Sequence, residues 1–303
     1  MNSECPSCGA AVSFAEGVIA DRCVFCDSPL VAGSEDTEHA DLVAPFLVAR
    51  RAAADRLSAW LAGRWLAPKT VRAAGEPSDL AGVLVPFWVC SATARSRWDA
   101  QVGIHWYRTE TYWVTVTRDG KTVRERRTRQ VQETEWFHSS GTHAASYDNH
   151  LVSGSRGLPE AEANALEPFD LGSARPYEAA LLAGWVAERA TIPRAEAAGV
   201  AEAELRSVEE QAVRAFLPGD RAKRVDVRSD VEVSPGRLAL LPVWIANYTW
   251  DGAVHRLLVN GQTGEVVGSV PTSWGRVGLA IAGGIAALAA VVIFVLVVVG
   301  VSQ

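Results

Sequence analysis

Four cysteines near the start of this 303-residue chain could do chemistry. The motif C-P-S-C-G supplies Cys5 and Cys8, and C-V-F-C supplies Cys23 and Cys26. Two C-x-x-C pairs at this spacing indicate zinc, because each turn aims two thiolates at one point and zinc prefers four ligands in a tetrahedron. Four thiolates leave no position for water, so we expect a structural Zn²⁺. Two disulfides or a redox pair are the alternatives. Disulfides need an oxidising compartment and no signal peptide precedes Cys5, and a redox C-x-x-C is expected in a βαβ context that is absent here.

The segment around these cysteines is too short to bury a core of its own, so the metal would supply folding energy to a zinc ribbon over residues 1–31. Residues 32–41 are polar and acidic and are typical of a linker. Residues 1–42 carry eight acidic side chains against the single base Arg22. Such a segment repels phosphate and is better suited to contact with protein.

The other end of the chain predicts a membrane anchor over residues 276–303. No charged side chain interrupts Val277 to Val301, and a stretch of about 25 apolar residues is long enough to cross a bilayer as a helix. A buried core helix is the alternative. Trp274 and Arg276 lie just before this apolar stretch, where aromatic and basic residues are typical of a membrane interface. They favour an orientation with the N-terminal domains in the cytoplasm. A homodimer could form through a stripe of small residues, Gly278, Ala282, Ala286 and Ala290.

Between these ends, residues 42–275 indicate one α+β domain. Apolar residues at helical spacing predict a helix over 46–66, ended by Pro68, with arginines between them. The stretch 83–135 reads as strands with a basic hairpin around Asp119-Gly120. The arginine-rich helix over 46–66 and the basic hairpin around Asp119-Gly120 are either faces exposed to solvent or contact surfaces for anionic lipid or nucleic acid.

Residues 160–217 predict helices, including 178–191 and 196–217, and strands return over 224–270. The segment Val85–Val89 echoes Leu241–Ile245, since both carry Pro second and Trp fourth. The two are candidates for similar strands that pair in one sheet. The expected fold is therefore α+β: an N-terminal zinc ribbon, a central antiparallel-sheet domain with helices, and a C-terminal transmembrane helix.

A catalytic site is harder to find. A polar stretch holds His138, His143, Asp148 and His150, but its spacing matches no metal motif, and histidines on a polar loop explain it equally. Cys90 follows Trp88 on a hydrophobic strand and is expected to be a buried thiol rather than a nucleophile. No phosphate-binding loop or nucleophile elbow is visible in the sequence. The net charge of −6 argues against a protein that coats nucleic acid.

Further motifs extend over most of the chain beyond the cysteines. They are A-P-F-L-V-A-R-R-A-A (44–53), W-L-A-G-R-W-L-A-P (60–68), G-V-L-V-P-F-W (82–88), E-P-F-D-L (167–171), L-L-A-G-W (181–185), L-L-P-V-W (240–244) and N-G-Q-T-G-E-V-V-G-S-V-P (260–271). With the cysteine pairs, they resemble a family of bacterial zinc-ribbon proteins with one membrane anchor, often labelled primosomal helicase-like. The resemblance implies recruitment of phage-shock-type and SPFH-domain proteins to the inner membrane face in envelope stress.

Three hypotheses follow. The first is a non-enzymatic, membrane-anchored zinc-ribbon adaptor that recruits cytoplasmic partner proteins. The second is a membrane-tethered nucleic-acid binder that uses the basic helix and hairpin. The third is a hydrolase that uses the His138–His150 region.

Overall fold

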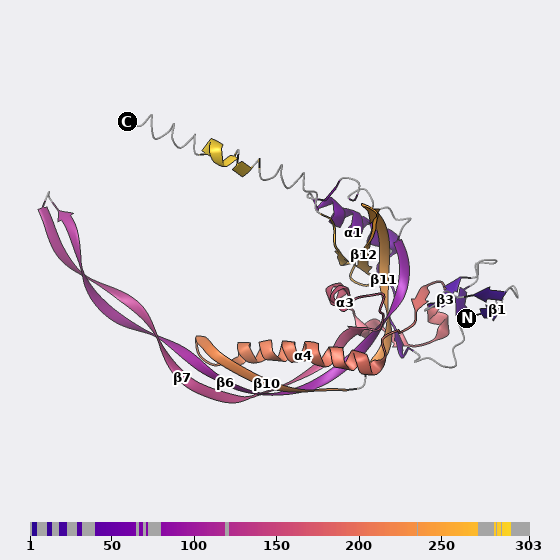
Figure 1. The fold of residues 1–303 in the computed structure, drawn as a ribbon, viewed down its shortest axis with the longest axis horizontal. Helices are drawn as coiled ribbons and strands as arrows, with labels where there is room; N and C mark the ends of the chain where they lie inside the picture. Colours follow the sequence, from indigo (N-terminus) through magenta and orange to yellow (C-terminus); the bar gives the residue numbers. More distant parts are fainter. Residues whose placement is uncertain are drawn as a thin grey trace. The chain divides into compact units, whose positions relative to one another are not determined.

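The structure is a computed structural model (Figure 1). It describes residues 2–4, 11–13, 18–22, 29–31, 40–64, 67–68, 71, 80–118, 121–234, 236–271, 282, 284–285 and 287–291.

The described elements are mostly strands. The helices are α1 (Arg50–Ala62), α3 (Glu160–Leu166) and α4 (Arg194–Phe216), with 3-10 turns η2 (Leu171–Ser173) and η3 (Ala179–Leu182). The strands are β1 (Asn2–Glu4), β2 (Ala11–Ser13), β3 (Val18–Arg22), β4 (Pro29–Val31), β5 (Leu42–Val43), β6 (Leu80–Arg118), β7 (Lys121–Ser153), β8 (Arg175–Pro176), β9 (Val186–Glu188), β10 (Arg221–Val233), β11 (Arg237–Trp250), β12 (Ala253–Asn260) and β13 (Val266–Gly268).

The chain divides into two compact units. The first comprises Met1–Val89, Leu151–Pro193 and Arg237–Gln303, and the second comprises Cys90–His150 and Arg194–Gly236. We call them the core unit and the arm unit.

In the core unit, β11 pairs antiparallel with the start of β6, placing Leu241 opposite Val85 and Pro242 opposite Leu84. The two segments that echo each other in the sequence therefore lie on paired strands and meet at Val85 and Leu241. Both bury their apolar side chains because the sheet carries core on each side.

Helix α1 covers one part of this core. Its buried residues Ala53, Ala54, Leu57 and Leu61 recur at three- and four-residue intervals and therefore share one face. Trp244 lies in the same cluster, and its indole nitrogen donates to the Val48 carbonyl at 3.0 Å. The arginine-rich helix predicted over 46–66 is thus present as an amphipathic helix with one face packed in the core.

In the arm unit, α4 lies along a sheet of three strands in which β6 pairs with both β7 and β10 (Figure 1). Even-numbered residues of β6 from Ala92 to Val102 are buried, while Thr93, Arg95, Arg97 and Asp99 are exposed. This alternation arises because successive side chains of a strand point to opposite faces. One face packs on α4, and we call the other the open face.

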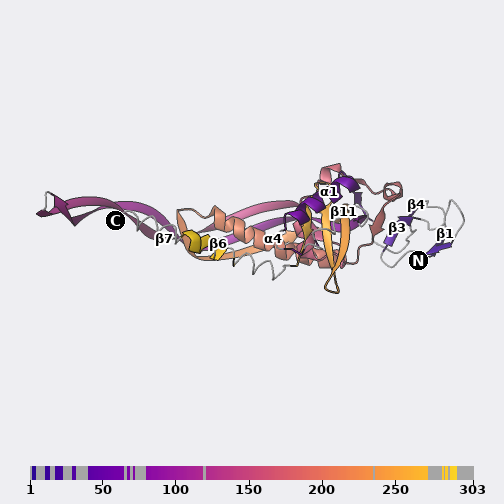
Figure 2. The ribbon, with the colours of Figure 1, turned by 90° about the horizontal axis from the view of Figure 1, so that it is seen from above.

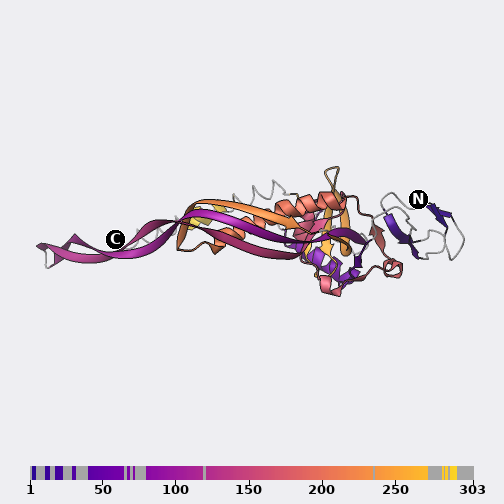
Figure 3. The ribbon, with the colours of Figure 1, turned by 90° about the horizontal axis from the view of Figure 1, so that it is seen from below.

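Beyond this sheet, β6 and β7 continue as a two-stranded hairpin. It comprises Ile104–Arg118 of β6 and Lys121–Phe137 of β7, and we call it the distal ribbon. Figures 2 and 3 show its two strands winding around each other. The strands end at Arg118 and begin at Lys121, which agrees with the hairpin predicted around Asp119-Gly120.

The predicted fold class is wrong. The sheet is mixed rather than antiparallel, since β11 pairs parallel with β5 and β6 pairs parallel with β9. The described chain is also dominated by strands. The predicted helix over 178–191 is replaced by η3 and β9, because Gly184 adopts a φ of 89° that ends the turn and releases Val186–Glu188 to join the sheet. The predicted polar loop around His138–His150 is part of strand β7.

The zinc-ribbon and transmembrane parts of the predicted fold also need correction. Cys5, Cys8, Cys23 and Cys26 lie outside the described residues, and the residues that are described hold no group of three or more metal-ligating side chains. Most of Val277–Val301 likewise lies outside them. Within the ranges given above, no helix is both long and apolar enough to span a bilayer. The description of the chain as a zinc-ribbon, transmembrane protein thus has no support from the structure.

Candidate functional site

The arm unit holds a buried polar cluster between α4 and the sheet. The carboxylate of Glu209 is fully buried and accepts three side-chain hydrogen bonds. The donors are Ser96 Oγ at 2.6 Å, Tyr147 OH at 2.7 Å and His143 Nδ1 at 2.8 Å. We call these four residues the Glu209 cluster, and every strand face that contributes to it packs on α4.

The sequence explains why a carboxylate occupies this place. The buried residues of α4 are Ala197, Ala201, Leu205, Glu209 and Val213, which recur every four residues and form one stripe. Glu209 therefore lies on the apolar face of the helix. A buried carboxylate is costly unless it is hydrogen-bonded, and β6 and β7 supply the donors.

The electrostatics of the cluster are those of a stabilised carboxylate. Burial alone raises the pKa of Glu209, but hydrogen bonds from Ser96, Tyr147 and His143, with the His143 charge, bring it below its ordinary value. Burial, together with the hydrogen bond to Glu209, raises the pKa of Tyr147 to about 12. The tyrosine is thus a firmly protonated donor, and the glutamate is an acceptor.

This arrangement lacks a feature that a hydrolytic site needs. A nucleophile must reach substrate with its base beside it, whereas Ser96 is buried, with its oxygen bonded to Glu209 and lying 2.8 Å from Ser229 Oγ. The cluster fits a role in fixing α4 to the sheet better than a role in bond cleavage.

The structure separates the histidines that the sequence grouped. His143 contacts Glu209, His150 Nε2 lies 2.9 Å from Glu204, and His138 Nε2 lies 3.2 Å from Asp99. His138 lies on the open face of the sheet, whereas His143 faces α4. The three imidazoles serve three different carboxylates, so they do not form one acid–base constellation.

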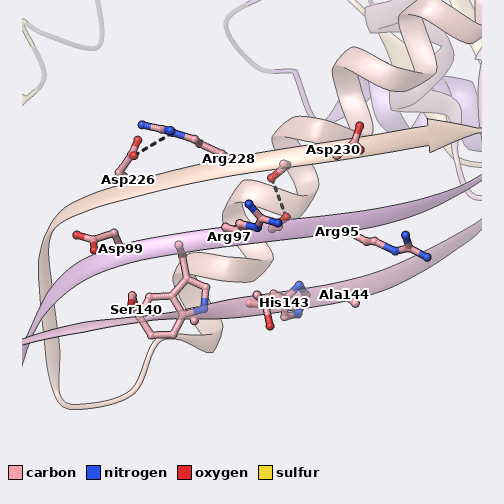
Figure 4. Close-up of a pocket in the computed structure, with 14 residues that line it drawn as sticks. Arg95, Arg97, Asp99, Ser140, His143, Ala144, Asp226, Arg228 and Asp230 are labelled. Carbon is pink, nitrogen blue, oxygen red and sulfur yellow. Dashed lines mark hydrogen bonds and ion pairs between the residues drawn. The ribbon is translucent and has the colours of Figure 1, made fainter.

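The open face of the arm unit forms a shallow groove across all three strands (Figure 4). Arg97 is directly opposite Arg228, and Asp99 is directly opposite Asp226. Like charges opposite each other are unfavourable, but Arg228 Nε lies 3.4 Å from Asp226, and Asp230 faces Arg95 in the next row. The arginines and aspartates of the groove thus balance one another along and across the strands.

The distal ribbon is the most exposed described part of the arm unit, and it carries large apolar side chains. Tyr107 is 63% exposed and Trp113 is 58% exposed. The others of this kind are Ile104, Trp106, Val123 and Phe137. The Arg124 guanidinium lies 5.7 Å from the Trp113 ring centroid, and that of Arg129 lies 5.3 Å from the Tyr112 ring centroid. The exposed apolar side chains lie on both faces of the ribbon, because successive side chains of a strand point to opposite faces. Large apolar side chains exposed on one element are a feature of contact surfaces.

Three of the seven lysines and arginines of the ribbon lie in ion pairs. Arg108 Nε lies 2.9 Å from Glu133, Arg129 Nη2 lies 2.8 Å from Glu110, and Arg127 contacts Glu125 at 3.3 Å. These ion pairs reduce the charge available to a phosphate backbone.

The basic helix predicted as a second anionic contact is also engaged within the chain. Arg50 donates to the Leu80 carbonyl and Arg56 donates to the Thr263 carbonyl. Arg64 lies 4.1 Å above the Trp60 ring. Arg50 and Arg56 thus fix α1 to its surroundings, whereas Arg64 contacts a side chain of the helix itself.

Two other predicted sites have simple outcomes. Cys90 is buried, as expected, and burial raises the pKa of its thiol. The zinc ligands Cys5, Cys8, Cys23 and Cys26 lie outside the described residues, so their metal stays a prediction.

Comparisons with known proteins identify one relative. The chain is 25% identical over 237 residues to the uncharacterized protein YdjG of Bacillus subtilis (strain 168), an alignment that covers 78% of this chain and 64% of that protein. The chain therefore spans less than two thirds of the relative's length. No family model and no solved structure matches the chain.

Proposed function

We propose that the chain is a non-enzymatic adaptor that binds partner proteins through the distal ribbon. The observation that carries this proposal is the exposure of Tyr107, Trp113 and the neighbouring apolar side chains on an element with no core behind it. Isolated two-stranded hairpins are marginally stable in water, so a ribbon of this length gains most from a surface that packs against it.

Aromatic side chains interleaved with arginines suit this role. Tyr, Trp and Arg are enriched at the centres of protein interfaces because they combine a large apolar area with a polar group. Phage-shock-type and SPFH-domain proteins, which the family resemblance implies as partners, remain candidates to be tested.

Binding of nucleic acid through the basic segments is the competing function. The ion pairs of Arg108, Arg127 and Arg129 within the ribbon favour the adaptor instead. The carbonyl contacts of Arg50 and Arg56 on α1 favour it too.

Site-specific photo-crosslinking in cells tests the proposal. A benzoyl-phenylalanine replaces Trp113, and in a matched control it replaces Leu47, whose side chain in the core unit is 59% exposed. We expect discrete protein adducts from position 113 that are absent from position 47. Equal adducts at both positions, or adducts removed by nuclease, would contradict the proposal. A product of twice the mass of the chain reports self-association and is scored separately.

A further inference from the structure

The outer edge of β7 is the surface that carries a further inference. Within the part of the chain that the structure describes, β7 pairs with β6 alone. One edge of a long strand therefore presents backbone donors and acceptors that can pair with another strand. Natural edge strands are commonly protected by charges that repel a second copy, so the order of charges along β7 decides what the edge can accept.

Charges along the ribbon part of β7 are mostly segregated by sign. Arg126, Arg127 and Arg129 lie before Val131, together with Glu125, which contacts Arg127, whereas Glu133 and Glu135 lie after it. In an antiparallel pair the two strands run in opposite directions. An antiparallel second copy of β7 would therefore bring its acidic half beside the basic half of the first.

We propose that two copies of the chain associate through this edge, with a two-fold axis at Val131. In this register Arg127 faces Glu135 of the second copy and Arg129 faces its Glu133, and each pair occurs twice. Isologous two-fold contacts are the commonest way in which homodimers form.

The other residues of the strand agree with the same register. On the opposite face Thr128 lies across from Thr134, Gln130 from Gln132, and Arg126 from Trp136, which are pairs that hydrogen-bond or make cation–π contacts. Moving the register by two residues places Glu125 against Glu135 in one direction, and in the other direction it leaves Arg129–Glu135 as the one Arg–Glu pair of the strand. Moving it by four places Arg129 or Glu133 against its own copy. Only the register centred on Val131 forms both Arg–Glu pairs without such a like-charge contact.

The ion pairs within each ribbon extend the argument across four strands. Arg129 already contacts Glu110 of β6, and Glu133 already contacts Arg108 of β6. In the dimer, four charged side chains would lie in line across the four strands: Glu110 and Arg129 of one copy, then Glu133 and Arg108 of the second copy. Charge alternates along the whole row, and the marginal two-stranded ribbon becomes part of a four-stranded sheet.

Charge reversal on the full-length chain tests this inference. The Arg127→Glu and Glu135→Arg variants each place like charges in both symmetric pairs, and neither residue takes part in the Arg108–Glu133 or Arg129–Glu110 pair. Arg127→Glu also removes the exposed contact between Arg127 and Glu125 within one chain, whereas Glu135→Arg leaves that contact in place. Each variant should raise the dimer Kd by about fivefold or more, because two favourable cross-strand charge pairs become two unfavourable like-charge contacts. An equimolar mixture of the two variants should restore wild-type association, since every pair is then complementary.

Sedimentation velocity at about 100 µM, where a micromolar Kd gives mostly dimer, reads the outcome. Arg118→Glu, at the end of β6, is the matched control and should leave association unchanged, and far-UV circular dichroism confirms that each variant is folded. A monomeric wild type, variants that associate normally, or a folded mixture that fails to recover would each overturn the proposal. This result is independent of the adaptor proposal, because the partner is expected on the ribbon faces and not on the β7 edge.

Discussion

Replacing Glu209 by leucine should destabilise the arm unit strongly. Hydrogen bonds to a charged group contribute about 1.5–3 kcal/mol each, so the three bonds to this carboxylate set an upper limit of about 5–9 kcal/mol. Two of the three donors that lose the Glu209 carboxylate have another hydrogen-bond partner, because Ser96 lies 2.8 Å from Ser229 and the His143 side chain is 19% exposed to water. We therefore expect a loss of about 3–5 kcal/mol, the range found when one member of a buried pair is removed.

Hydrogen exchange of the α4 amides measures this loss, because it reports opening of the arm unit whatever the core unit does. The control is Glu202→Leu in the same helix, whose 44% exposed carboxylate pairs with Arg206 and should contribute less than about 0.5 kcal/mol. An opening free energy that falls by less than about 1 kcal/mol in Glu209→Leu would refute the reasoning.

The stabilisation by Glu209 should also depend on pH. Its folded-state pKa is depressed, so its contribution is complete above the unfolded pKa and is lost as the pH falls through the folded pKa. The difference in opening free energy between wild type and Glu209→Gln should therefore shrink below about pH 4.3. A difference that stays constant down to pH 3 would contradict this assignment.

Three other predictions use different parts of the molecule. Tyr147 has its pKa raised to about 12, so it contributes stability below about pH 10 that is lost as the pH rises toward 12; Tyr147→Phe should remove this alkaline loss in hydrogen exchange. Gly141→Ala should destabilise the arm unit by about 1–3 kcal/mol, because the added Cβ would lie 2.8 Å from the Trp98 ring, whereas Gly199→Ala in α4, with nothing within 4 Å, should stabilise it by about 0.5–1 kcal/mol. Alkylation of Cys90, followed by mass spectrometry, should be slow in the native chain and fast after denaturation, and rapid native labelling would contradict its burial and raised pKa.

Local signals in the sequence predict part of this fold well. The apolar spacing over 46–66 and 196–217 identifies α1 and α4, and Asp119-Gly120 identifies the hairpin between β6 and β7. The echo between Val85–Val89 and Leu241–Ile245 even identifies two paired strands. These features are readable because each depends on periodicity or turn chemistry within one short segment.

What the sequence conceals depends on long-range partners. The stretch 138–150 looks like a polar loop because both faces of this part of β7 carry polar side chains. One face is open to solvent. On the other face, His143 hydrogen-bonds the buried carboxylate of Glu209, which lies 66 residues later in the sequence. Glu209 itself carries a signal that could have been used, namely a carboxylate at the fourth-residue spacing of Ala201, Leu205 and Val213. The parallel pairing of β9 with β6 has no local signal, and the apolar residues before it imitate a helix.

The ribbon's role as the docking element is tested most directly by removing it. In a shortened variant, residues 108–131 are replaced by Asn-Gly, which retains the three-stranded sheet and α4, and hydrogen exchange in α4 verifies that the arm unit is intact. Affinity for the protein captured at position 113 is then measured for the full-length and shortened chains. The account predicts at least about a hundredfold weaker binding, equivalent to about 2.7 kcal/mol. Unchanged affinity in a shortened chain with a protected α4 would contradict it.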